Sequence, residues 1–247
     1  MTDAVIFLDF DGVLHRFEGT HFEYVERLAD VLDAHPGAKI VFSTSWQYQM
    51  STAELAAHLP ERMRSRVIGG TADDAAQAHL DSREPGWLSN FSRTPGIVSF
   101  HNRERLAEGW IQAYRPGVPL LSLDDDAFRF SYRCNRLLLC LDGFYESEAA
   151  LLHSWLAAPG RDMQEIVREA APADPADWTV RDATAAVIYR DGEPVLDALP
   201  DVLREAALRL MGTPTAEQWE AMLSSWGMTR RWPPAMDEDD MKKEWLP

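Results

Sequence analysis

The sequence predicts an α/β fold in which helices cover both faces of a parallel sheet. Short apolar runs alternate with segments of helical periodicity over residues 1–158. Each run is apolar throughout instead of at every second position, which is typical of parallel strands buried on both sides. The alternation of strands and helices favours the same architecture. We therefore expect one sheet-based domain over residues 1–158.

The expected strands are 5–8, 39–44, 118–123 and 137–141, each built on a run of apolar residues, with a further short strand at 66–69. Apolar residues spaced three and four apart predict helices at 22–34, 104–114 and 146–156. Pro36 and Gly37 are expected to end the first of these helices. Ser51 to Glu54 has the form of a capping box and predicts the start of another helix.

Two regions depart from this pattern. Helical and strand periodicity fade over residues 69–96, where we expect a small flap over the sheet. Residues 159–247 are expected to form a small α+β appendage, with a hairpin around Asp191-Gly192 and two later helices. Its role is open: it would serve as a lid, a homo-oligomer contact or a docking site for a protein partner.

The composition narrows the classes of partner. The net charge is −16, so the protein repels nucleic-acid backbones and anionic membranes at long range. No apolar run approaches the roughly 18 residues that a membrane span needs, and no signal peptide is recognisable. The two cysteines are expected to be core thiols. We expect a cytoplasmic protein without a membrane partner.

Three of the expected strands run directly into oxygen-bearing side chains. They end in Asp9 and Asp11, in Thr44 and Ser45, and in the aspartates 124–126. Ligands of open parallel sheets bind beyond the carboxyl ends of the strands. Clustered carboxylates repel one another, and a hard divalent cation relieves that repulsion. Magnesium prefers oxygen ligands and leaves positions open for water and phosphate, so the sequence predicts a Mg²⁺ site for a phosphorylated ligand.

Each of these groups has a simpler interpretation when it is taken alone. An Asp-x-Asp-Gly segment after a strand is common in turns, hydroxyl residues often cap helices, and a run of aspartates can be a solvated turn. Their occurrence together, each at a strand end, favours a metal and phosphate site.

The segments IFLDFDGVL, KIVFSTS and LLSLDDD resemble the first, second and fourth motifs of the haloacid dehalogenase (HAD)-like hydrolase superfamily. The resemblance covers roughly residues 3–156 and is closest to small bacterial HAD domains found in some RNA-repair proteins. It implies a Rossmann-like, three-layer sheet. Residues 15–21 leave no room for a cap domain after the first motif, so we expect a minimal cap. His15 and His21 are expected to be ordinary loop histidines, and the alternative is that they line the entrance to the site.

The resemblance also implies catalytic roles. Asp9 would be the nucleophile, and Asp11 the general acid and base whose main-chain carbonyl also binds magnesium. Thr44 would bind a phosphoryl oxygen, with Ser45 or Ser43 as alternatives. The metal ligands would be Asp9, Asp11, Asp124 and Asp125, with Asp124 acting directly or through water.

The third motif of the superfamily is a lysine or arginine that binds the phosphoryl group. No lysine lies between Lys39 and Lys242, so this residue must be an arginine here. Arg103 fits best because it precedes the helix that leads into the strand ending at Asp124, and Arg105 is the alternative.

The function that follows is a Mg²⁺-dependent phosphatase acting on a phosphomonoester. An acid at the position of Asp11 favours phosphoester hydrolysis over dehalogenation, because dehalogenases lack it. The substrate is a phosphorylated small molecule, such as a nucleotide or sugar phosphate, or a nucleic-acid end. A non-catalytic module that binds Mg²⁺ and a phosphorylated ligand is the alternative, and phosphoryl transfer to an acceptor other than water is a third possibility.

Overall fold

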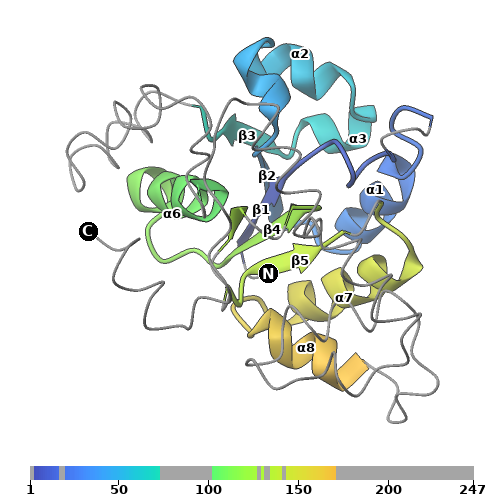
Figure 1. Ribbon diagram of the computed structural model, residues 1–247, viewed down its shortest axis with the longest axis vertical. Coiled ribbons are helices and arrows are strands. Elements are labelled where there is room, and N and C mark those ends of the chain that lie inside the picture. Colours follow the sequence, from blue (N-terminus) through green and yellow to red (C-terminus); the bar gives the residue numbers. More distant parts are fainter. Residues whose placement is uncertain are drawn as a thin grey trace, which may run out of the picture. The chain divides into compact units, whose positions relative to one another are not determined.

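The computed structural model describes residues 3–16, 20–72, 102–126, 129–130, 134–140 and 143–170. Its centre is a five-stranded sheet in which every neighbouring pair of strands is parallel (Figure 1). The strand order is β3-β2-β1-β4-β5. The strands are β1 (Ala4–Leu8), β2 (Ala38–Phe42), β3 (Val67–Gly70), β4 (Leu120–Asp124) and β5 (Leu137–Leu139).

The helices connect or follow these strands, as expected for an α/β fold. They are α1 (Val25–Asp33), α2 (Thr52–Ala57), α3 (Glu61–Arg64), α6 (Asn102–Tyr114), α7 (Glu146–Ala157) and α8 (Met163–Ala170), with the 3₁₀ helix η1 (Ser45–Tyr48). Helix α2 begins with the capping box predicted from the sequence, because the Ser51 hydroxyl accepts from the Glu54 amide while the Glu54 carboxylate accepts from the Ser51 amide.

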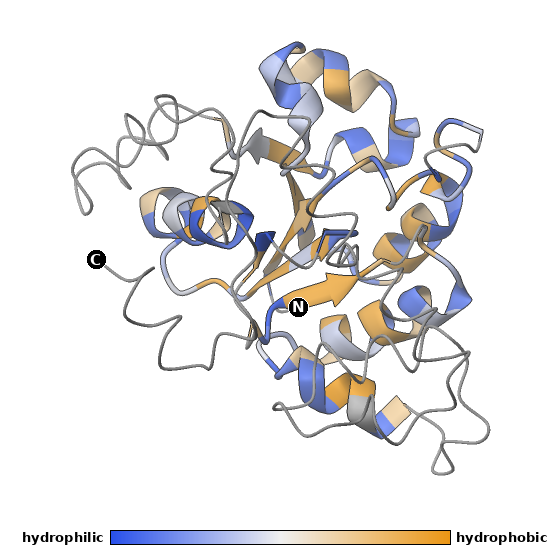
Figure 2. Ribbon diagram, viewed as in Figure 1, coloured by the Kyte–Doolittle hydropathy of each residue, from blue (hydrophilic) through white to orange (hydrophobic). Residues whose placement is uncertain are grey.

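Helices cover both faces of the sheet, which confirms the three-layer Rossmann-like prediction. Successive strand side chains point to opposite faces. Ile6 and Leu8 of β1 therefore enter one core with α1, α7 and α8, whereas Phe7 packs edge-on against Trp110 of α6. Figure 1 shows α6 on one side of the sheet and these three helices on the other, and Figure 2 shows the apolar strands between them.

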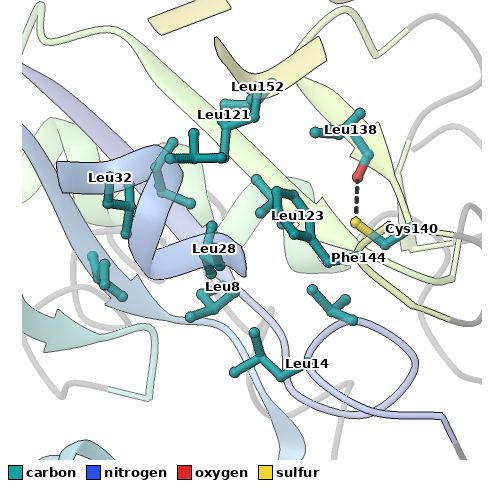
Figure 3. Packing of buried hydrophobic residues seen from close by; sticks show 14 of the residues in the cluster. Leu8, Leu14, Leu28, Leu32, Leu121, Leu123, Leu138, Cys140, Phe144 and Leu152 are labelled. Atoms are coloured by element: carbon teal, nitrogen blue, oxygen red, sulfur yellow. Dashed lines mark hydrogen bonds between the residues drawn. The ribbon is translucent and has the colours of Figure 1, made fainter. Parts of the chain in front are cut away.

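The larger core lies between the sheet and helices α1 and α7. Figure 3 shows Leu8, Leu28, Leu123 and Leu152 converging from four different elements. Both cysteines are free and buried, as expected, and the Cys140 thiol lies 3.7 Å from the main-chain oxygen of Leu138. Burial of these side chains from water holds the sheet in register under its helices.

Several element boundaries differ from those predicted. Helix α1 starts at Val25 instead of residue 22, because Phe22 has a φ of 59° and cannot join a right-handed helix. Strand β2 ends at Phe42, and Thr44 caps η1 instead of continuing the strand. Strand β4 extends to Asp124, so this aspartate pairs with Leu139 as a member of the sheet.

Helix α8 opens the segment that was expected to form the appendage, and it packs on the main core. Met163, Ile166 and Val167 are buried in the same cluster as the strands. The indole nitrogen of Trp155 in α7 donates to the carbonyl of Arg161 at 3.1 Å, which fixes the connection. The expected flap, hairpin and later helices lie outside the described residues, and the division of the chain at residue 158 stays a prediction.

None of the helices in the described ranges is long and apolar enough to cross a bilayer.

Candidate active site

The end of β1 forms the centre of the site, because β1 is the middle strand of the sheet. The Asp9 amide donates to the Leu123 carbonyl at 3.1 Å, which anchors the residue against β4. The Asp9 carboxyl group is buried and accepts from the Phe10 amide at 2.8 Å. Gly12 follows in a left-handed conformation, with a φ of 68°, and turns the chain away from the sheet.

The end of β4 brings two further carboxyl groups beside Asp9. Asp124 is buried and accepts from the Asp126 amide at 3.0 Å. Asp125 is partly buried and packs directly on Gly12, where a Cβ atom would lie 2.4 Å from its Oδ2 atom. The first motif and the aspartate triplet therefore fit together only when residue 12 has no side chain.

The end of β2 contributes a hydroxyl group on the other side of β1. Thr44 is buried, and its hydroxyl group lies beside the Asp9 carboxyl group, where it acts to lower the pKa of Asp9 against the effect of burial. The same hydroxyl accepts from the Trp46 amide at 3.4 Å, at the start of η1. Ser43 is also buried, but Ser45 is exposed on η1. Thr44 is thus the residue of the three that contacts Asp9.

The cation of the site comes from the first turn of α6. One guanidinium nitrogen of Arg103 pairs with both Asp9 and Asp124. Arg103 is mostly buried, so these ion pairs are shielded from water. Arg103 therefore occupies the position expected for the third motif, and Arg105 is half-buried two residues further along the helix. The phosphate-binding role of Arg103 stays a prediction.

Burial controls the electrostatics of the cluster. It raises the pKa of Asp9, although the neighbouring Arg103 acts in the opposite direction. Burial also raises the pKa of Asp124 to about 7. Burial and the negative charges of Asp124 and Asp9 raise the pKa of Asp125 to about 8. Burial opposes the charge of Arg103, but Asp124 and Asp9 outweigh it and raise the pKa of Arg103, which remains a cation.

Three carboxyl groups lie close enough together to hold one divalent cation between them. Asp9, Asp124 and Asp125 each offer one oxygen, and these oxygens all lie within 4.8 Å of one another. Oxygen ligands of this kind suit Mg²⁺, which commonly binds one or two carboxylates and keeps other positions for water or phosphate. A bound cation would favour the ionised carboxylates and reverse the rise in their pKa values.

Asp11 lies apart from this cluster and has its own partners. Its carboxylate receives a hydrogen bond from the Trp46 indole nitrogen at 2.9 Å, and His15 Nε2 lies 3.1 Å from its other oxygen. The sequence did not indicate a role for Trp46. His15 was expected to be an ordinary loop histidine, yet it is buried with 3% of its surface exposed. In the sequence, this contact could have been recognised from the spacing of four residues between Asp11 and His15 across a glycine turn.

The arrangement can support chemistry on a phosphoryl group. A buried carboxylate lies beside an arginine, a hydroxyl group and a cluster suited to a cation, and a second carboxylate lies nearby with more access to solvent. The fold and site together define a Rossmann-like α/β protein with an acidic cluster beyond the carboxyl ends of its strands.

The chain belongs to the family described as the HAD domain in Swiss Army Knife RNA repair proteins, whose model matches residues 5–144, more than half of the chain. This confirms the resemblance seen in the sequence motifs. No curated protein and no solved structure matches the chain.

Proposed function

We propose that this protein is a Mg²⁺-dependent phosphatase that hydrolyses a phosphomonoester through an aspartyl-phosphate intermediate. The observation that carries the proposal is the surroundings of Asp9. Its buried carboxyl group contacts Arg103 and Thr44, and the carboxylates of Asp124 and Asp125 lie within reach of a shared cation. A carboxylate nucleophile and a phosphate repel each other, and such surroundings offset that repulsion.

The residues divide the reaction into two steps. An oxygen of Asp9 attacks phosphorus, and the bond to the leaving oxygen breaks while Asp11 gives that oxygen a proton. Asp11 then takes a proton from water, whose oxygen attacks the phosphorus and releases phosphate and the free carboxylate of Asp9. Arg103 and Thr44 bind phosphoryl oxygens in both steps.

Mg²⁺ would be held by Asp9, Asp125 and the main-chain carbonyl of Asp11, with Asp124 acting directly or through water. When bound, it supplies positive charge that draws the phosphate toward Asp9 and stabilises charge in the transition state.

The substrate is proposed as a phosphorylated small molecule or a nucleic-acid end. The description of the family as part of RNA repair proteins supports the second choice, and the net charge of −16 weighs against it. A cytoplasmic location, and a homo-oligomer or protein contact through residues 159–247, are likewise proposals. A screen of phosphorylated metabolites and of oligonucleotides with 3′ or 5′ phosphates would separate the substrate classes.

The test of the activity is phosphate release from 4-nitrophenyl phosphate with and without Mg²⁺. We expect activity only with the metal, and we expect Asp9→Asn to lower kcat by at least about 10³-fold, because the nucleophile is lost. Asp33→Asn is a matched control, since Asp33 pairs with Arg62 and Arg66 on the surface, and it should retain wild-type activity.

The same experiment separates the alternatives. An inert wild type that still binds Mg²⁺ and inorganic phosphate would support the non-catalytic module. An Asp9→Asn variant as active as the wild type would refute the nucleophile. Activity that appears only when an alcohol acceptor is added would indicate phosphoryl transfer in place of hydrolysis.

A further inference from the structure

The Asp11 carboxylate is held at both of its oxygens by side chains from two separate segments. The Trp46 indole nitrogen donates to Oδ2 at 2.9 Å, and His15 Nε2 lies 3.1 Å from Oδ1. We propose that His15 and Trp46 are positioning residues that fix the rotation of this carboxylate toward the leaving oxygen. The inference rests on the proposed phosphatase function, in which Asp11 is the acid and base.

The backbone brings both side chains to Asp11. The Val13 and Leu14 amides donate to the Phe10 carbonyl, so residues 10–14 form a tight turn that places His15 beside Asp11. Trp46 reaches Asp11 from η1, whose start is fixed by the Thr44 hydroxyl. The residue that contacts the nucleophile thus also sets the helix that carries Trp46.

Neighbouring aromatic rings hold the His15 and Trp46 side chains in place. The Trp46 ring contacts Phe10 and Phe22 edge-on, with ring centroids 5.6 and 6.0 Å apart. The His15 ring lies against Phe22 at 5.3 Å and against His21 at 5.0 Å. Rings packed on several sides have little freedom to rotate, so their nitrogen atoms are preorganised toward Asp11.

The burial of His15 is hard to explain by stability alone. Its Nδ1 atom is buried and has no hydrogen-bond partner among the described residues, and an unpaired buried nitrogen destabilises a fold. Its other nitrogen is directed at Asp11. A polar ring is buried here at this cost, and its one polar contact among the described residues is with Asp11, which favours a role in activity.

The geometry matters because Asp11 is more exposed than the two fully buried carboxyl groups of the site. Its side chain is 31% exposed, compared with 2% for Asp9 and 1% for Asp124. Without the two contacts, its carboxylate would be free to turn toward solvent. Misplacing a catalytic group by about 1 Å can lower a rate by roughly 10²-fold.

The test measures kcat/KM of the variants Trp46→Phe and His15→Leu on two substrates that differ in their leaving group. The ratio kcat/KM reports the steps up to loss of the leaving group, and a poor leaving group needs the proton of Asp11 more than a good one. We expect kcat/KM to fall by about 10- to 100-fold for an alkyl phosphate, and by less than about 3-fold for 4-nitrophenyl phosphate. His153→Leu is the control, because His153 is an exposed histidine whose ring contacts His35 on the surface.

Two further measurements separate positioning from structural support. His15→Leu should leave Tm unchanged or raise it, and His15→Gln, whose amide can donate to Asp11, should recover part of the alkyl phosphate activity. Equal losses on both substrates, or the same selective loss in His153→Leu, would overturn the inference. If His15→Leu does not fold, Trp46→Phe decides the matter. A wild type inactive on every phosphomonoester would instead refute the proposed phosphatase function.

Discussion

At the residue scale, Gly12 joins the two acidic segments of the site. Its Cα atom lies against the Asp125 carboxyl group, and its φ of 68° belongs to the left-handed region that favours glycine. The glycine of the Asp-x-Asp-Gly segment therefore has two functions. It allows the turn after β1, and it leaves the space in which Asp125 approaches Asp9.

We predict that Gly12→Ala removes the stabilisation of the protein by Mg²⁺. The new methyl group would displace Asp125, whose Oδ2 atom lies 2.4 Å from the ideal Cβ position. The left-handed conformation adds about 1–2 kcal/mol of strain. The measurement is the rise in Tm on adding Mg²⁺, which should be present in the wild type and lost in the variant.

Gly117→Ala provides the matched control. Gly117 has a φ of 84°, so alanine is similarly strained there, but a Cβ atom at this position meets nothing within 4 Å. Both variants should therefore lose intrinsic stability, and only Gly12→Ala should lose the response to the metal. Equal Mg²⁺ responses in the two variants would contradict the prediction.

At the element scale, two helices complete the structure: α6 contributes a residue to the site, and α8 contributes residues to the core. Helix α6 supplies Arg103 to the carboxylates from one face of the sheet, while its Trp110 packs on Phe7. Helix α8 packs on the opposite face, where Met163 is fully buried and its amide donates to the Asn135 carbonyl at 2.9 Å. The sheet-based core thus includes residues beyond position 158.

We predict that Met163→Ala lowers the free energy of unfolding by about 2–4 kcal/mol, because it opens a cavity in the main core. Urea unfolding gives this value. Glu165→Ala is the control on the same helix, since Glu165 is exposed, and it should change stability by about 0.5 kcal/mol or less. A loss as small in Met163→Ala as in the control would mean that α8 does not contribute to the core in solution.

At the scale of the whole molecule, the acidic cluster links stability to pH. Folding raises the pKa of Asp124 from its usual 3.8 to about 7 and that of Asp125 to about 8. Between about pH 4 and pH 8 the folded protein therefore binds more protons at these two aspartates than the unfolded chain does. Its free energy of unfolding therefore decreases as pH rises.

We predict that, without a divalent metal, the cluster makes its largest contribution to the free energy of unfolding below about pH 4. This contribution is lost as the pH approaches about 8. Urea unfolding at a series of pH values measures it. Asp125→Asn should flatten this dependence, because the amide does not titrate. Mg²⁺ should flatten it as well, since the cation binds the ionised carboxylates and stabilises the folded state more at higher pH. Identical pH profiles for the wild type and Asp125→Asn would contradict the prediction.

The sequence by itself determined the architecture and the main polar positions. The strands were recognisable because both of their faces are buried, so their residues are apolar without interruption. Since parallel strands end at one edge of the sheet, Asp9, Thr44 and Asp124 could be expected to meet. Arg103 was also a reasonable expectation, because lysine is absent from this part of the chain.

Only the tertiary structure decided which neighbours these residues have. Thr44 contacts Asp9 because η1 starts there, and Asp11 is held by His15 and Trp46, the second of which is 35 residues away. Hydrophobic periodicity reports which face of an element is buried, but not which side chains meet across a turn or between elements. Those contacts depend on how the segments pack together, and that packing gives the acid and base of the proposed reaction its orientation.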